Sequence, residues 1–128
     1  MLFIEYPKCT TCIKAKAFLK SLSVDFVSRN IKEDNPTKEE LIKWHKESGL
    51  PLKKLFNTSG LLYKELNLKD KLDTMTDEEK YDLLASNGMI VKRPILITSK
   101  GVTFGFNEEW LELIKWKKRK SSFFLSFI

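Results

Sequence analysis

Leu2-Phe3-Ile4-Glu5-Tyr6-Pro7-Lys8-Cys9-Thr10-Thr11-Cys12 is the stretch that decides the fold. Its first part, residues 2–6, is apolar and β-rich, which predicts a short buried strand. The segment from Ile13 to Leu22 predicts a helix. The two cysteines therefore lie on a strand-to-helix turn, with Cys9 near the first helical positions.

That placement favours thiol chemistry. A helix N-terminus presents unpaired N–H groups and a partial positive charge, and both stabilise a thiolate. Cys-x-x-Cys motifs lower a cysteine pKa from about 8.5 to between ~3.5 and ~7.5. Cys12 lies about one helical turn after Cys9, so it can attack a mixed disulfide formed at Cys9 and release the product. The spacing predicts Cys9 as nucleophile and Cys12 as resolving cysteine.

Two other interpretations of the cysteine pair stay open. Tetrahedral zinc needs about four ligands. The chain has two cysteines and one histidine, His45, so zinc would have to recruit carboxylates or a second chain. An inert structural pair is the third interpretation, although there are no further cysteines to build a disulfide framework. We favour redox chemistry and predict no metal site and no bound cofactor.

The composition suits one soluble domain of 128 residues, 42% hydrophobic and 31% charged. No apolar run approaches the ~18 residues of a membrane span, and no basic region precedes an apolar one as in a signal peptide. We therefore expect a cytoplasmic protein without a membrane span. Residues 115–128 carry five of the six net positive charges. The body is nearly neutral, so direct nucleic-acid binding is not expected.

The middle of the chain alternates between strand and helix signals. Residues 24–29 predict a second strand, parallel to the first because one helix connects them. Thr37 with Glu40 predicts a capping box at a helix that Gly49 ends. Short helical segments are expected at 50–56 and 61–66, separated by the break at 57–60. Thr76 with Glu79 predicts a second capping box, on a helix ending at 87–88.

The last part predicts a hairpin and a helix. Residues 95–98 and 102–105 flank the turn at 99–101, which predicts antiparallel strands. Asn107 is expected to cap a final helix whose buried face holds Trp110, Leu113 and Ile114. The order predicts an α/β fold, a thioredoxin-like (glutaredoxin-like) mixed sheet with a helical insertion at about 36–88 between its βαβ and ββα halves. The domain would span 1–114, followed by a basic and apolar tail at 115–128.

The sequence resembles the ArsC/Spx family, the arsenate-reductase-like proteins of the thioredoxin-like fold. The resemblance covers about residues 2–114. It rests on four stretches in the right order, Tyr6 to Ala15, Phe56 to Gly60, Tyr63 to Leu68 and Lys92 to Ile95.

The resemblance implies three roles at the site. Cys9 would be the nucleophile, Arg93 would point at a bound oxyanion or at the thiolate, and Pro94 would be cis and bring backbone close to the active sulfur. An arginine suits this position because its cationic fork matches oxyanions. The further substrate-binding candidates are Lys8, Thr10, Thr11 and Asn57. Lysines such as Lys8 are more often simply solvated, and Asn57 could equally serve the turn.

The departures from the family pattern open a choice of function. Arsenate reductases of the family use one essential cysteine and three arginines, whereas here the two other arginine positions hold Asn57 and Phe106. The second cysteine, Cys12, resembles the Spx branch, where the pair is a dithiol/disulfide switch in a regulator that binds the C-terminal domain of the RNA polymerase α-subunit. We therefore expect an oxidoreductase reduced by thioredoxin or glutathione/glutaredoxin or, alternatively, an Spx-type regulator. A scaffold with a vestigial motif is a less favoured third interpretation.

Overall fold

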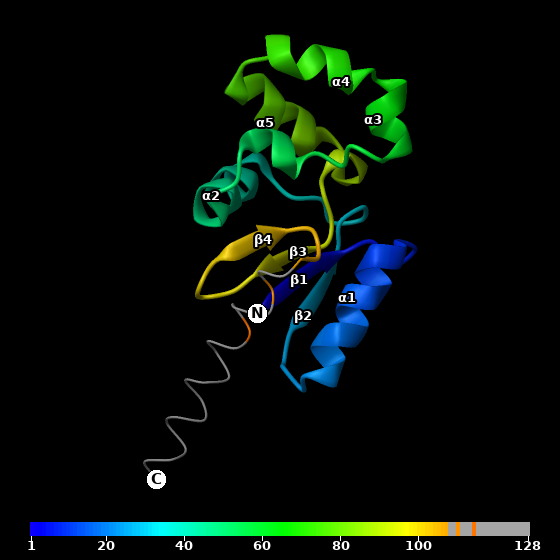
Figure 1. Ribbon diagram of the computed structural model, residues 1–128. Helices are drawn as coiled ribbons and strands as arrows, with labels where there is room; N and C mark the ends of the chain where they lie inside the picture. Colours follow the sequence, from blue (N-terminus) through cyan, green and yellow to red (C-terminus); the bar gives the residue numbers. More distant parts are fainter. Residues whose placement is uncertain (108–109, 111–113, 115–128) are drawn as a thin grey trace.

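Figure 1 shows the computed structural model, which describes residues 1–107, 110 and 114. The elements follow in the order β1 (Leu2–Glu5), α1 (Thr10–Ser21), β2 (Val27–Asn30), α2 (Lys38–Ser48), η1 (Leu52–Leu55), α3 (Leu61–Glu65), α4 (Leu68–Lys71), η2 (Leu72–Thr74), α5 (Asp77–Ser86), η3 (Gly88–Ile90), β3 (Ile95–Ile97) and β4 (Val102–Phe104). The helical segments from α2 to η3 lie between the two halves, and they are called the insertion below.

The four strands form one mixed sheet in the order β2-β1-β3-β4. β1 runs parallel to β2, with Leu2 opposite Val27. β1 is antiparallel to β3, with Ile4 opposite Ile95, and β3 is antiparallel to β4. This confirms the predicted α/β fold with a parallel first pair and a terminal hairpin.

Each face of the sheet is covered by a different part of the chain, because successive strand side chains point to opposite faces. Phe3 of β1 and Leu96 of β3 pack with Ala15 and Leu19 of α1. Ile4 and Ile95, their neighbours in sequence, pack instead against the insertion. Figure 1 shows α1 on one side of the sheet and α2–α5 on the other.

Both predicted capping boxes are present. The Thr37 hydroxyl accepts from the Glu40 amide at 3.1 Å, and the Glu40 carboxylate accepts from the Thr37 amide. Thr76 and Glu79 repeat the arrangement at the start of α5. Gly49 ends α2 in the left-handed conformation at φ 68°, which glycine adopts without a steric cost.

Some element boundaries differ from the prediction. The second strand begins at Val27 rather than at residue 24, since Val24 and Phe26 pack into the cluster on the α1 side instead of extending the edge of the sheet. α4 has no predicted counterpart. Its four residues are too few to show a helical repeat, although Leu68 is buried.

The end of the chain lies largely outside the described residues. This covers most of the helix expected after Asn107, including Leu113, and the predicted tail at 115–128. Trp110 and Ile114, expected on its buried face, are buried in the cluster with Phe3. Within the described residues, no helix has the length and apolarity to cross a membrane.

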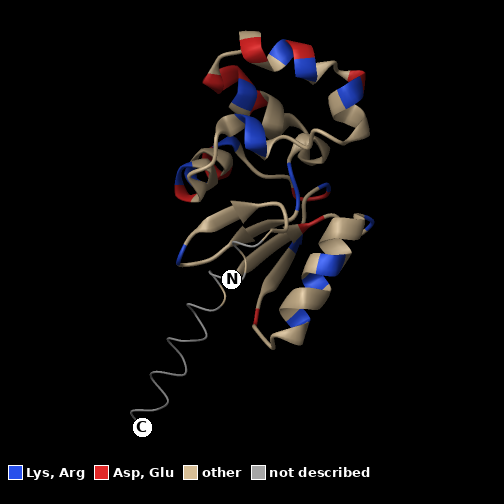
Figure 2. Cartoon of the chain, viewed as in Figure 1, with Lys and Arg blue, Asp and Glu red and all other residues tan. Residues whose placement is uncertain are grey.

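Charge is distributed differently over the two sides of the sheet. Figure 2 shows both signs of charge spread over the insertion, whereas α1 carries lysines only. One of these lysines, Lys16, pairs with Glu5 of β1 at 3.1 Å. The helix that follows the cysteine motif therefore adds no negative charge near the thiols.

Candidate active site

Cys9 is the N-cap residue of α1. Its backbone is extended, with φ −81° and ψ 122°, and its sulfur accepts a hydrogen bond from the Cys12 amide at 3.4 Å. The turn that leads into it is closed by a hydrogen bond from the Cys9 amide to the Tyr6 carbonyl at 2.9 Å. The helix therefore begins at Thr10, three residues before the predicted start, and the sulfur sits where a capping oxygen usually does.

Arg93 reaches the same sulfur from the segment before β3. Its guanidinium carbon lies 5.4 Å from the centre of the Tyr6 ring, and Nη1 donates to the Met89 carbonyl at 3.1 Å. Its Nε is buried and has no hydrogen-bond acceptor within the described part of the chain. The Arg93–Pro94 peptide bond is cis, as the family resemblance implied.

Their surroundings shift the pKa values of the two cysteines in opposite directions. Burial alone would raise the pKa of Cys9, but the Cys12 amide and thiol and the charge and hydrogen bond of Arg93 outweigh it, so the pKa is lowered. Burial raises the pKa of Cys12 to about 12, and the neighbouring Cys9 adds to this. Cys9 is half-buried while the Cys12 side chain is fully enclosed, and both are free thiols. The more accessible thiol, Cys9, is therefore the one that ionises first.

Cys9 opens into a cavity of about 410 Å³ that the insertion and the sheet build together. Four predicted site residues meet there, namely Cys9, Thr11, Asn57 and Arg93. Asn57 is brought to the site because its amide donates to the Ile90 carbonyl at 2.7 Å, beside the bridge between Phe56 and Val91. A Cβ on Gly60 would lie 2.5 Å from the side-chain nitrogen Nδ2 of Asn57, so a glycine at this position leaves room for the Asn57 side chain.

The other predicted site residues do not line this cavity. Lys8 and Thr10 are exposed on the turn and at the first helical position, and Cys12 and Pro94 are buried behind the lining. Pro94 instead supports the site through its carbonyl, which accepts from the Gly105 amide at 2.7 Å. Their proposed contacts with substrate stay predictions.

Several lining residues were not predicted as site residues. They are Ser59, Gly60, Lys92, Phe104, Gly105, Phe106 and Asn107. Lys92 could have been found as the neighbour of Arg93, whereas Phe106 and Asn107 were singled out only as a departure from the family's arginine positions and as a helix cap. Phe106 has a packing role, since its ring contacts Trp110 at 4.9 Å and Phe18 at 5.4 Å between centroids.

His45 has the packing role that the sequence indicated. Its Nδ1 is 2.5 Å from the Tyr81 hydroxyl and its Nε2 is 2.8 Å from the Leu50 carbonyl, inside the insertion. Among the described residues, no three His, Cys, Asp or Glu side chains gather closely enough to hold a metal ion.

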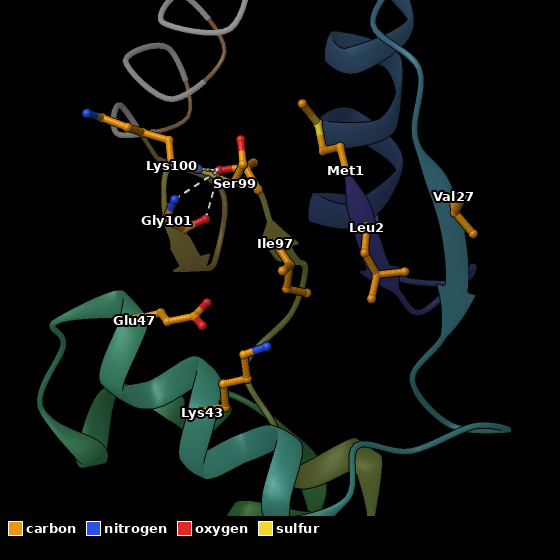
Figure 3. Close-up of a pocket in the computed structure, with 10 residues that line it drawn as sticks. Met1, Leu2, Val27, Lys43, Glu47, Ile97, Ser99, Lys100 and Gly101 are labelled. Carbon is orange, nitrogen blue, oxygen red and sulfur yellow. Dashed lines mark hydrogen bonds between the residues drawn. The ribbon is translucent and has the colours of Figure 1, made fainter.

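A larger cavity, of about 780 Å³, lies at the opposite end of the strands. Figure 3 shows Lys43 and Glu47 of α2 facing Leu2 and Ile97 across it. Among the described residues, its lining has no cysteine and shares no residue with the Cys9 cavity. The size of a cavity therefore does not locate the chemistry of this fold.

Comparisons with known proteins agree with this architecture. The sequence model of the ArsC family matches residues 4–114. The uncharacterized protein YusI of Bacillus subtilis is 49% identical over 86% of this chain and 93% of its own length. The regulatory protein MgsR of the same organism is 33% identical, over 93% and 91%. An ArsC family related protein of Bacteroides fragilis has a TM-score of 0.85 at 54% identity, covering 88% of this chain and 95% of its own. This chain belongs to the ArsC family.

Proposed function

We propose that the protein is a cytoplasmic thiol–disulfide oxidoreductase of the arsenate-reductase-like kind, with Cys9 as nucleophile and Cys12 as resolving cysteine. One observation carries the proposal. An accessible thiol with a lowered pKa caps α1, and a second thiol lies behind it on the same helical turn. This is the environment in which a cysteine reacts as a thiolate near neutral pH.

The reaction would proceed in two exchanges. The Cys9 thiolate attacks one sulfur of a substrate disulfide, forming a mixed disulfide and expelling the other half as a thiolate. Cys12 then loses its proton and attacks the Cys9 sulfur, which expels the second half and leaves a Cys9–Cys12 disulfide. Two electrons pass from the protein to the substrate, and thioredoxin or glutathione/glutaredoxin would return them.

The lowered pKa of Cys9 and the raised pKa of Cys12 suit this order of events. The neighbouring Cys9 is one cause of the raised pKa of Cys12. A sulfur in a mixed disulfide carries no negative charge, so this contribution disappears once Cys9 has reacted. Cys12 therefore becomes easier to ionise at the step that needs its thiolate.

The anion-binding part of the cavity is weaker than the family's arsenate site would be. Arg93 supplies one guanidinium, while Asn57 and Phe106 line the cavity in place of the other two. Each missing charge-assisted hydrogen bond removes about 1.5–3 kcal/mol of oxyanion binding. We therefore propose disulfides, rather than arsenate, as the preferred substrates.

Multiple-turnover assays test this function. Reduction of a model disulfide and of arsenate would each be coupled to NADPH oxidation through thioredoxin or glutaredoxin. We expect turnover of the disulfide that Cys9→Ser abolishes and Cys12→Ser strongly reduces. Turnover that persists in Cys9→Ser would refute the mechanism, and faster reduction of arsenate than of the disulfide would refute the substrate preference.

A second candidate is a redox-sensing regulator that binds the C-terminal domain of the RNA polymerase α-subunit. Its support is the likeness to MgsR, which is described as a regulatory protein, together with the Cys-x-x-Cys pair. Here the Cys9–Cys12 disulfide would change the surface offered to the polymerase without turnover. Titration of the isolated polymerase domain with oxidised and reduced protein tests it, and equal affinities would remove the switch.

A further inference from the structure

A second cavity, of about 390 Å³, adjoins the one at Cys9. The two share Lys92, Phe104 and Asn107 as lining residues, so they lie side by side. The remaining lining residues of the second cavity come from the stretch between α2 and α3, namely Leu50, Lys53, Lys54, Phe56 and Thr58. Each cavity lies in the size range of small-ligand sites, about 300–1,000 Å³.

The second cavity is positively charged. Lys53 and Lys54 stand side by side on η1, and Lys92 enters from the segment before β3. None of these three ammonium groups forms an ion pair with a described residue, and no described Asp or Glu lines either cavity. Like charges gathered without a counter-charge attract an anion from solution.

Lys92 belongs to the lining of both cavities. Lys92 is half-buried, and its Cε lies 3.1 Å from where a Cβ on Gly105 would be. Its amide donates to the Leu55 carbonyl at 2.7 Å, which ties the segment before β3 to η1. The three lysines are therefore carried by two segments that a backbone hydrogen bond joins directly.

From this arrangement we propose that the site takes small organic disulfides that carry a carboxylate on the half-molecule bound in the second cavity. The proposal rests on Cys9 being the nucleophile, as proposed above. The disulfide lies at Cys9, the apolar part of the ligand passes Phe104 toward Phe56, and the carboxylate meets Lys53, Lys54 and Lys92. The ligand needs an organic linker because the lysine-lined cavity adjoins the cavity at Cys9 and does not itself contain the thiol.

The first covalent step then has a defined direction. The Cys9 thiolate forms a bond to the sulfur of the half bound in the lysine-lined cavity, the substrate S–S bond breaks, and the other half leaves as a thiolate. The Cys12 thiolate then attacks the Cys9 sulfur and forms the Cys9–Cys12 bond. The bond from Cys9 to the bound half breaks, and that half leaves as a thiolate. Both electrons of the reduction come from the two cysteines, so no further reactant is needed for one turnover.

Two chromogenic disulfides separate this idea from simple thiol reactivity. Dithiobis(nitrobenzoate) carries a carboxylate on each half, whereas dithiodipyridine is uncharged near neutral pH. Stopped-flow rates would be measured with both for the full chain, for Lys53→Gln/Lys54→Gln, and for Lys69→Gln/Lys71→Gln. The last variant removes the same charge from exposed positions of α4, so it controls for the overall charge.

We expect the ratio of the anionic to the neutral rate to fall by roughly three- to tenfold in Lys53→Gln/Lys54→Gln, and to change little in the α4 control. Added salt should lower the same ratio in the unaltered protein. An unchanged ratio in Lys53→Gln/Lys54→Gln, or an equal fall in the control, would overturn the lysine subsite while leaving Cys9 as nucleophile. A Cys9 that reacts with both reagents no faster than free cysteine would overturn the proposed function and the subsite together.

Discussion

The start of α1 differs from the starts of α2 and α5. Thr37 and Thr76 cap the two insertion helices with hydroxyl oxygens 3.1 and 3.2 Å from the amides they accept from, and each is backed by a glutamate in a capping box. α1 is capped by the Cys9 sulfur at 3.4 Å, and its first turn has no acidic residue.

The contrast separates two uses of the same position. A hydroxyl at the N-cap satisfies a helix amide permanently, whereas a neutral thiol is a weak acceptor. The Cys12 amide is therefore only weakly paired while Cys9 is a neutral thiol. This amide and the partial positive charge at the start of α1 can both stabilise a thiolate at Cys9. A glutamate in the first turn would compete for them, which is consistent with its absence here. The insertion helices begin in a way that favours stability, and α1 begins in a way that favours reactivity.

Replacing the cap of α1 should have the largest functional effect. Cys9→Ser keeps a capping oxygen but removes the nucleophile, so we expect no mixed disulfide and no turnover. Cys12→Ser should still form a mixed disulfide at Cys9, but should release it only slowly because the resolving thiol is gone. Mass spectrometry after one addition of a model disulfide would show both results. A mixed disulfide on Cys12 in the Cys9→Ser protein would contradict the assigned order.

Removing the cation beside α1 should have the next largest effect. Arg93→Gln takes away a charge that lowers the pKa of Cys9, so we expect alkylation at pH 7 to slow by roughly three- to tenfold. The rates of the two proteins should converge at alkaline pH, where both thiols are ionised. Arg93→Lys is the matched control because it keeps the charge, and it should retain most of the rate. An equal loss at every pH would indicate damage to the fold instead.

Removing the caps of the insertion should affect stability and leave the thiol alone. Thr37→Ala and Thr76→Ala each lose a capping box, and we expect each to lower the free energy of unfolding by about 1 kcal/mol. Urea denaturation measures this loss. The pH profile of Cys9 alkylation in the folded variants should not move. A shift of that profile would mean that the two kinds of helix start are not independent.

The smallest effect is a gain in stability at α1. Because the pKa of Cys9 is lowered in the folded protein, its contribution to stability is fully present above the unfolded value, about 8.5, and is lost as the pH falls through the folded value. Below that folded value Cys9 is a weakly capping thiol. Cys9→Ser should therefore stabilise the protein there by about 0.5–1 kcal/mol, and the gain should shrink toward pH 9.

Cys9→Ala is the control for that gain, since it removes the sulfur without adding a hydroxyl. It should be less stable than Cys9→Ser at every pH. Equal stability of the two variants would show that this position does not act as a cap.

The sequence predicted the elements that depend on local chemistry. The two Thr and Glu boxes, the glycine end of α2 and the hairpin all follow from residues a few positions apart, and all were found. The predicted start of β2 was three residues too early, because long-range packing of Val24 and Phe26 against the α1 side overrode their β propensity.

The candidate site was predictable only in part. Cys9, Thr11, Asn57 and Arg93 could be found from the motif and the family resemblance. Gly105 comes to the site beside the pairing of β3 and β4, where its amide donates to the Pro94 carbonyl, and Lys92 comes through its backbone bond to the Leu55 carbonyl. These contacts join residues far apart in the sequence, so the local pattern did not place either residue at the site. The lysines of η1 lie in the short helical segment expected at 50–56, but no sequence pattern places them beside Lys92.

The most direct test of the role of Cys9 is the pH dependence of its alkylation, followed residue by residue by mass spectrometry in the reduced protein. The structure predicts a midpoint for Cys9 below that of free cysteine, about 8.5, with Cys12 unmodified until far higher pH. A midpoint at or above that of free cysteine, or equal modification of the two thiols, would contradict Cys9 as an activated nucleophile at the start of α1.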